Sequence, residues 1–105
     1  MDNVVEYQIY IGCHDSHSRH ELVKEHDLRE MVVSFFRRKK IDFSVLSAKG
    51  GYLHTDGSFV TEDSLCIDIV DASEMDIVSL AHSLSMYMNQ ECVLVTRSPL
   101  TRWFQ

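Results

Sequence analysis

Proline and glycine are scarce in this sequence. Its 105 residues contain one proline and four glycines, which leaves little material for a flexible linker between domains. The length suits one ordinary domain and excludes a two-domain enzyme, a P-loop ATPase or a TIM barrel. Hydrophobic residues make up 45% of the chain and charged residues 25%, which are the proportions of a globular protein. We therefore expect a single globular domain.

Long apolar runs are also missing. No stretch approaches the ~20 residues that a membrane-spanning helix needs, and the first residues lack the basic start and apolar stretch of a targeting segment. The three cysteines form no Cys-x-x-Cys pair, and an odd number fits poorly with a disulfide framework. We expect no membrane association, a cytoplasmic location with reduced thiols, and burial of Cys66 and Cys92 as small hydrophobes.

The spacing of apolar residues predicts six elements. Strict alternation, as in Leu65, Ile67 and Ile69, is typical of a half-buried strand, whereas apolar residues three or four positions apart favour a helix. The expected elements are a strand at 4–12, a helix from 21 or 27 to 39, strands at 42–53 and 59–70, a helix that Ser73 caps and that ends near 89, and a strand at 91–97.

The predicted order β-α-β-β-α-β is that of the ferredoxin-like split βαβ arrangement, an α+β fold. It has one four-stranded antiparallel sheet with both helices on one face. We expect residues 1–97 to form this domain and residues 98–105 to form a C-terminal tail. The other face of the sheet then meets solvent or a partner, and its expected apolar residues are Tyr10, Leu46, Val60, Val70 and Leu94.

Glycines and basic residues mark two segments whose simplest interpretation is structural. Gly50-Gly51 lies between two strands, so it favours a bulge or bend over a phosphate-binding loop, which should lead into a helix. The segment 54–57, which ends in Asp-Gly, predicts a hairpin turn. The basic run at 37–40 suits the negative end of a helix dipole, and direct nucleic-acid binding is not expected from it.

The densest group of possible metal ligands is Cys13, His14, His17 and His20. A divalent cation such as Zn²⁺ needs three or four thiolates or imidazoles at fixed geometry. This spacing matches no strong metal-site signature, so a polar loop of surface histidines is the simpler interpretation and no cofactor is expected. A regulatory protein that binds a metal or a small ligand through residues 13–26 remains an alternative.

Candidate catalytic groups are few. Cys13 next to His14 offers a nucleophile and a base, but neighbours on a strand point to opposite faces. His54 near Asp56 in the predicted turn is a candidate acid–base group. A small enzyme that acts through Cys13 or His54 is therefore a second alternative, and the sequence favours a protein without catalytic activity.

Basic residues are absent from nearly half of the chain. Residues 1–49 carry eight acidic and eight basic residues, whereas residues 50–96 carry eight acidic residues and no Lys or Arg. Arg97 and Arg102 bring the net charge to −6. A negative surface attracts a protein with a basic groove, although solubility and helix capping explain acidic residues as well. The expected partner-binding residues are Glu62, Asp63, Asp68, Asp71, Glu74 and Asp76.

Large apolar side chains are concentrated in the predicted tail. Leu100, Trp103 and Phe104 follow the last predicted strand, and exposed aromatic residues at a chain end favour packing against another surface. Together with an open sheet face, they predict a homodimer in which these three residues lie at the interface.

Three segments resemble a known group of proteins: Tyr7-x-Ile9-Tyr10-Ile11-Gly12, Gly51-Tyr52-x-His54-x-Asp56-Gly57-x-x-Val60-x-Glu62-x-x-Leu65-x-Ile67, and Asn89-Gln90-Glu91-x-Val93-x-Val95. They are similar to small uncharacterised proteins of bacterial phages, plasmids and integrated elements. The resemblance implies a compact α+β sandwich and carries over no catalytic residue. With the acidic half, it favours a non-enzymatic interaction protein, in its sharpest form an inhibitor of a host defence nuclease of the anti-CRISPR type.

Overall fold

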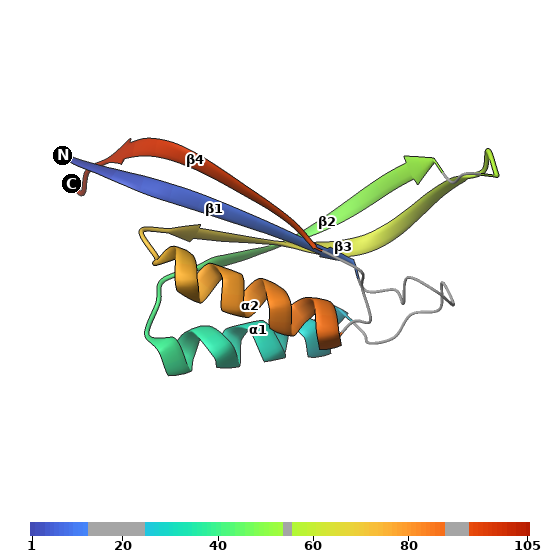
Figure 1. Ribbon diagram of the computed structural model, residues 1–105, viewed down its shortest axis with the longest axis horizontal. Helices are drawn as coiled ribbons and strands as arrows, with labels where there is room; N and C mark the ends of the chain where they lie inside the picture. Colours follow the sequence, from blue (N-terminus) through green and yellow to red (C-terminus); the bar gives the residue numbers. More distant parts are fainter. Residues whose placement is uncertain (13–24, 54–55, 88–92) are drawn as a thin grey trace.

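The computed structural model describes residues 1–12, 25–53, 56–87 and 93–105. Within them the elements are β1 (Asp2–Gly12), α1 (Glu25–Lys39), β2 (Ser44–Leu53), β3 (Phe59–Val70), α2 (Glu74–Tyr87) and β4 (Leu94–Arg102). The strands form one sheet in the order β2-β3-β1-β4, and every neighbouring pair is antiparallel. Both helices lie on the same side of this sheet (Figure 1). The predicted ferredoxin-like α+β fold is confirmed.

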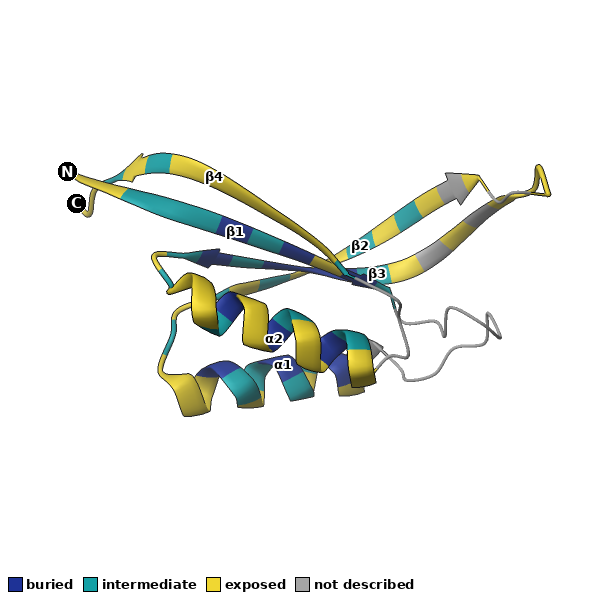
Figure 2. Cartoon of the chain, in the orientation of Figure 1, coloured by how far each residue is buried: buried dark blue, intermediate teal, exposed yellow. Residues whose placement is uncertain are grey.

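The core lies between the helices and the two central strands (Figure 2). Ile9 of β1 is paired with Ile67 of β3, and Ile67 is paired with Val45 of β2, so alternate residues of three strands meet on one face. Ile9 and Ile67 are fully buried, as the alternation predicts. The fully buried residues that fill this space are Ile9, Ile11, Leu28, Val32, Phe36, Leu65, Ile67, Ile69, Leu80 and Leu84.

The structure confirms the predicted start of α2 and excludes one of the two predicted starts of α1. Ser73 caps α2 as predicted: its Oγ accepts a hydrogen bond from the Asp76 N–H (3.1 Å) and donates to Asp76 Oδ2 (3.0 Å). The described part of α1 already includes Glu25, so the alternative start at Asp27 is wrong. At the other end of α1, the ring of Phe36 stacks on that of Phe43 at 4.6 Å, which ties the helix to the segment before β2.

Strand β4 is longer than the sequence predicts. It was expected to end at Arg97, but it continues to Arg102, and Pro99 is paired with Val5 inside it. Proline is accepted here because β4 is an edge strand, where one side of the backbone needs no hydrogen-bonding partner. Most of the predicted tail at 98–105 is therefore part of the sheet, and this extension brings Arg102 to the site described below.

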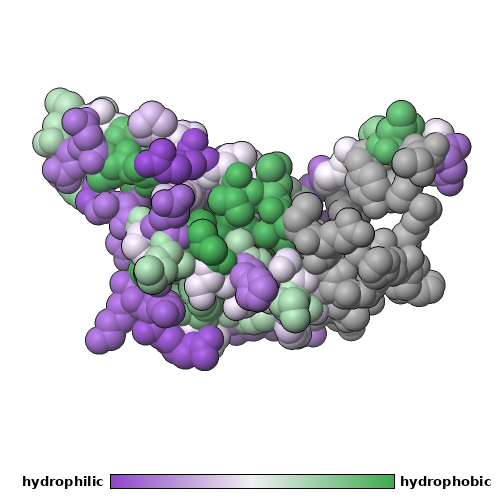
Figure 3. Space-filling view, viewed as in Figure 1, coloured by the Kyte–Doolittle hydropathy of each residue, from purple (hydrophilic) through white to green (hydrophobic). Residues whose placement is uncertain are grey.

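The β2–β3 hairpin extends beyond the helices (Figure 1). Its end carries hydrophobic atoms (Figure 3), and Leu53 and Phe59 are exposed there. In the turn, Asp56 Oδ1 accepts a hydrogen bond from the Ser58 N–H (2.9 Å) and Gly57 has φ 89°, which confirms the predicted Asp-Gly turn. Among the described residues no helix is long and apolar enough to cross a membrane.

Of the bulge or bend predicted at Gly50-Gly51, the bulge is not formed. Both glycines are paired one to one with β3, Gly50 with Glu62 and Gly51 with Thr61, so no extra residue is inserted. Gly51 has a steric role instead, because a Cβ atom there would lie 2.8 Å from the Phe59 ring. The absence of a side chain at Gly51 leaves room for that ring.

Candidate functional site

The face of the sheet that lies away from the helices carries the polar side chains of the central strands. Alternation places Glu6, Gln8 and Tyr10 of β1 on this outer face, opposite to the buried Ile9. The predicted exposure is confirmed for Tyr10, Leu46 and Leu94, which are 37%, 57% and 61% exposed. Val70 of the same set is half-buried, and the side chain of Val60 lies outside the described residues.

Cys66 lies in the middle of this outer face and is still buried, as its apolar neighbours in the sequence predicted. Its cross-strand partners are Tyr10 on one side and Leu46 on the other, and they cover it. A hydrogen bond with the Cys66 thiol and the negative charge that the thiolate would carry raise the pKa of Tyr10. The Tyr10 hydroxyl also donates to Gln8 Oε1 at 3.2 Å, so a small polar network crosses β1 and β3.

Two carboxyl groups meet further along the same face. Asp68 of β3 is paired with Gln8, next to Glu6, and the side chains of Glu6 and Asp68 form a hydrogen bond. This hydrogen bond raises the pKa of Glu6, and partial burial and the negative charge of Asp68 act in the same direction. Glu6 therefore keeps its proton to a higher pH than an isolated glutamate does.

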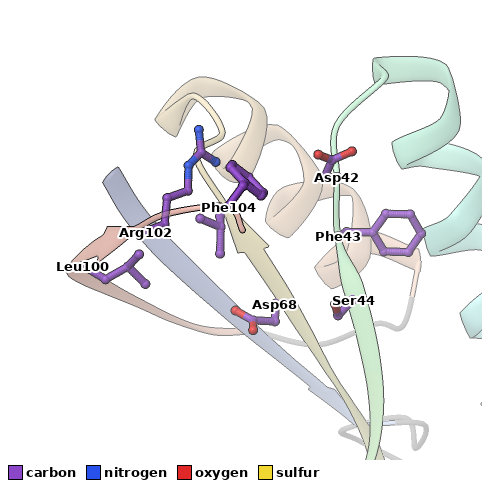
Figure 4. Close-up of a pocket in the computed structure, with 8 residues that line it drawn as sticks. Asp42, Phe43, Ser44, Asp68, Leu100, Arg102 and Phe104 are labelled. Carbon is purple, nitrogen blue, oxygen red and sulfur yellow. The ribbon is translucent and has the colours of Figure 1, made fainter. Parts of the chain in front are cut away.

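A cavity of about 340 Å³ opens beside Asp68. One side is formed by the start of β2 and the end of β3, and the other by the end of β4 and the residues after it (Figure 4). The ring of Phe43 points away toward α1, whereas Asp68 reaches across the sheet toward β4 (Figure 4). The residues that line the cavity are Asp42, Phe43, Ser44, Asp68, Val70, Leu100, Arg102 and Phe104.

Arg102 is fixed on the β4 side of the cavity. Its Nη2 donates to Asp71 Oδ2 at 2.9 Å, its Nε lies 3.5 Å from Asp2 Oδ2, and its guanidinium lies 5.4 Å from the centre of the Phe104 ring. Asp71 is itself held in place, because it has a left-handed φ of 67° and its N–H donates to the Val5 carbonyl at 2.9 Å. The cationic side chain is therefore positioned before any ligand arrives.

Two buried polar atoms in this cavity lack a hydrogen bond to any described residue: Asp68 Oδ1 and Arg102 Nε. The first is an acceptor on an anion and the second is a donor on a cation. Buried polar atoms in folded proteins are nearly always hydrogen-bonded, so each such exception calls for an explanation. Both residues line the same cavity, and the two atoms themselves are shielded from it.

The predicted acidic residues lie on several elements of the fold. On the hairpin, Asp63 Oδ1 lies 3.5 Å from Lys49 Nζ. At the start of α2, Asp76 Oδ1 lies 3.8 Å from Nζ of Lys39, the last residue of α1. Asp71 forms an ion pair with Arg102. Asp68 lies in the cavity, Glu74 is exposed on α2, and the side chain of Glu62 is outside the described residues. Three of the predicted acids are thus paired with basic side chains, and a role in binding a protein partner stays a prediction.

The predicted metal ligands Cys13, His14, His17 and His20 lie outside the described residues, and so does His54. Among the described residues no group of three His, Cys, Asp or Glu side chains is placed to hold a metal ion. Of the three predicted interface residues, Trp103 and Phe104 are 60% and 84% exposed, and Leu100 is half-buried in the cavity wall. Their role between two copies of the chain stays a prediction.

Sequence reasoning missed Glu6, Asp42 and Arg102 as site residues. Arg102 was considered only as a positive charge, because a strand was not expected beyond Ser98-Pro99. Residues 98–102 show no clear apolar alternation, so the sequence carried little signal that the strand continues after the proline. The partnership of Glu6 and Asp68 depends on the β1–β3 register, which alternation alone does not define.

Solved structures of similar fold include phage proteins. A phage SAM lyase in complex with S-methyl-5'-thioadenosine aligns with a TM-score of 0.67 and 22% identity, over 97% of this chain and 93% of that one. A phage SAM lyase in the apo state gives a TM-score of 0.63 and 21% identity, over 98% and 94%. The periplasmic divalent cation tolerance protein CutA from Archaeoglobus fulgidus aligns with a TM-score of 0.61 and 7% identity, over 99% of this chain and 89% of that one.

These similarities show the fold. No family model matches the sequence, and no curated protein is significantly similar to it. Two of the three structures are phage proteins of nearly the same length as this chain.

Proposed function

We propose that this protein is a lyase that binds S-adenosylmethionine (SAM) and releases S-methyl-5'-thioadenosine. The observation that carries the proposal is the likeness of almost the whole chain to a phage SAM lyase that holds this thioether. The reaction class differs from the non-enzymatic inhibitor that the sequence favours, but the two proposals agree on a phage-encoded protein. Removal of SAM would deprive host defence enzymes that need this methyl donor.

The cavity on the outer face offers suitable chemistry for this substrate. SAM is a sulfonium cation, and the carboxylates of Asp42 and Asp68 give the cavity wall a negative side. Phe104 offers an exposed ring at the mouth for the adenine base. The volume of about 340 Å³ lies at the lower end of the range for small-molecule sites, ~300–1,000 Å³.

The bond that breaks in this reaction limits how close the carboxylates of the cavity can lie to the sulfur atom. When the bond between sulfur and the methionine Cγ breaks, its electron pair goes to sulfur, and the positive charge of the sulfonium disappears. The carbon is supplied with electrons from within the substrate, either from a neighbouring C–H bond that loses its proton or from the substrate carboxylate. A carboxylate in contact with sulfur would stabilise the substrate more than the transition state. The acids of the cavity should therefore act at a distance from the sulfur atom.

Chromatography of SAM incubated with the purified protein tests the function. Wild type should convert SAM to S-methyl-5'-thioadenosine, and Asp68→Asn should lower the rate at least tenfold. Asp63→Asn is the matched control, because Asp63 is a β3 aspartate on the hairpin, outside the cavity. Glu62→Gln adds a third arm: if this variant loses activity and Asp68→Asn keeps it, the site lies on the hairpin. Absence of the thioether product with wild type would contradict the proposed activity.

The acidic half of the chain favours a second candidate function. Residues 50–96 carry eight acidic residues and no Lys or Arg, which suits an inhibitor that occupies the basic groove of a nucleic-acid-binding defence enzyme. Glu74 is exposed on α2 and would contribute to such a surface. Replacement of Glu62, Asp63 and Glu74 by lysine should abolish binding to the target enzyme while the melting curve is retained. An unchanged affinity would rule this function out.

A further inference from the structure

We infer that Glu6 is a positioning residue for the outer-face cavity, because its carboxyl proton holds the Asp68 carboxylate in the place where Asp68 meets a ligand. This inference rests on the proposed function and deepens it, since it names a second carboxyl group that controls the same site. Asp68 lines the cavity, whereas Glu6 is not among the lining residues. Glu6 therefore acts through Asp68 and not by contact with the substrate.

The register of the sheet places the two carboxyl groups side by side. Glu6 of β1 is opposite Val70 of β3, and Asp68 lies two residues before Val70 on the same outer face. Diagonal neighbours of this kind are within reach of long side chains, and the two carboxyl groups form a hydrogen bond. Because two carboxylates offer no donor, this hydrogen bond exists only while one of the two groups carries a proton.

The hydrogen bond with Glu6 is the contact that holds the Asp68 side chain. Asp68 Oδ1 is buried, and no N–H, hydroxyl or amide group of the described residues donates a hydrogen bond to it. Loss of the Glu6 proton would therefore leave the Asp68 carboxylate without a hydrogen bond to the described part of the chain. A buried polar group in that state is costly, so the side chain gains by moving.

The groups next to Glu6 offer its proton no other charged partner. Its neighbours on the outer face of β1, β3 and β4 are uncharged apart from Asp68: Val4, Gln8, Val70 and Ser98. Arg97 follows Tyr7 in its pairing, and Tyr7 is buried on the inner face, so alternation directs Arg97 to that other side. Both helices also lie on the inner side of the sheet (Figure 1).

The other charged groups of the outer face lie further from Glu6. Arg102 is opposite Asp2, four residues from Glu6 along β1, and it forms ion pairs with Asp2 and Asp71. Asp42 lies on the far side of Asp68, two residues before the β2 residue that is paired with Asp68. When Glu6 ionises, the nearest charge that it meets is therefore Asp68, and the two carboxylates repel each other.

The rate of SAM cleavage over a pH series tests the consequence, after the enzyme-free rate is subtracted. The pKa of Glu6 is raised by its hydrogen bond with Asp68, and the wild-type rate should fall at least threefold as the pH rises through this raised value. Glu6→Gln should lack this fall and be at least threefold faster than wild type at the alkaline end, because its amide N–H donates to Asp68 at every pH. Glu6→Met has no donor and should be at least threefold slower than wild type at the acid end.

Glu30→Gln is the matched control, because Glu30 is an exposed glutamate of α1 on the other side of the sheet. Its pH profile should equal that of wild type. A second measurement needs no substrate: in a ¹³C NMR titration, the Asp68 carboxyl resonance should move at the pH where Glu6 loses its proton. Glu6→Gln should abolish this movement, and Glu30→Gln should retain it.

The two measurements separate the inference from the proposed function. If wild type leaves SAM intact while the Asp68 resonance follows the titration of Glu6, the proposed function fails and the positioning of Asp68 by Glu6 is supported. If the Asp68 resonance does not respond to Glu6, the inference is overturned even if SAM is cleaved. It is also overturned if SAM is cleaved and Glu6→Gln keeps the wild-type pH profile.

Discussion

The two faces of the sheet are built from the same strands and have opposite properties. On the inner face Ile9, Ile67 and Ile69 are completely buried under the helices. On the outer face their neighbours in the sequence include Tyr10, Cys66 and Asp68, which form polar contacts across strands. Because alternate residues of a strand point to opposite sides, one segment contributes both to the core and to the cavity. Stability and chemistry can therefore be changed separately, by substitutions one residue apart.

The largest effect is expected on the inner face. Ile67→Ala should lower the free energy of unfolding by ~2–5 kcal/mol, because it leaves a hole among residues that are fully buried. Leu46→Ala on the outer face is the matched control, since Leu46 is 57% exposed and its truncation should cost less than ~1 kcal/mol. Urea denaturation followed by circular dichroism measures both values. Similar losses for the two variants would contradict the division between the faces.

Self-association tests whether the open face and the chain end are covered by a second copy. Trp103 and Phe104 are exposed after β4, and Leu100 lies in the cavity wall beside them. We expect a homodimer in size-exclusion chromatography with light scattering, and a monomer for the double variant Trp103→Ser, Phe104→Ser. A strictly monomeric wild type would rule this interface out and leave the outer face open in solution.

A smaller effect is expected where α2 begins to cover the inner face. Ser73→Ala removes the oxygen that accepts the Asp76 N–H and should lower stability by ~1 kcal/mol. Ser79→Ala is the control within the same helix, because Ser79 is exposed. Thermal denaturation of the two variants should give a lower midpoint for the first only. Equal midpoints would show that the cap contributes nothing measurable.

The smallest effect is a pH dependence from the outer face. The folded protein holds the Glu6 proton more tightly than the unfolded chain does, because the pKa of Glu6 is raised in the fold. The stability from this proton is fully present below the ordinary glutamate pKa of ~4.3 and is lost as the pH rises through the raised value. Glu6→Gln should flatten this loss in a series of melting curves. A variant with the wild-type slope would show that the carboxyl pair is not linked to folding.

The sequence predicted most of the inner face and little of the cavity, for a physical reason. Burial of Leu65, Ile67 and Ile69 follows from alternation, and the cap at Ser73 follows from local hydrogen bonding, so both were visible in short segments. The cavity brings together Asp68 of β3 and Arg102 of β4, which are distant in the sequence. Their proximity depends on strand order, register and the passage of β4 through Pro99, and no short segment contains that information.

The central claim is tested most directly by the rate at which S-methyl-5'-thioadenosine is released from SAM. This rate is measured for Asp68→Asn, for wild type and for Leu46→Ala. The account predicts that wild type and Leu46→Ala release the thioether at similar rates, and that Asp68→Asn is at least tenfold slower with an unchanged melting temperature. The account is contradicted if wild type leaves SAM intact, or if Asp68→Asn is as active as wild type.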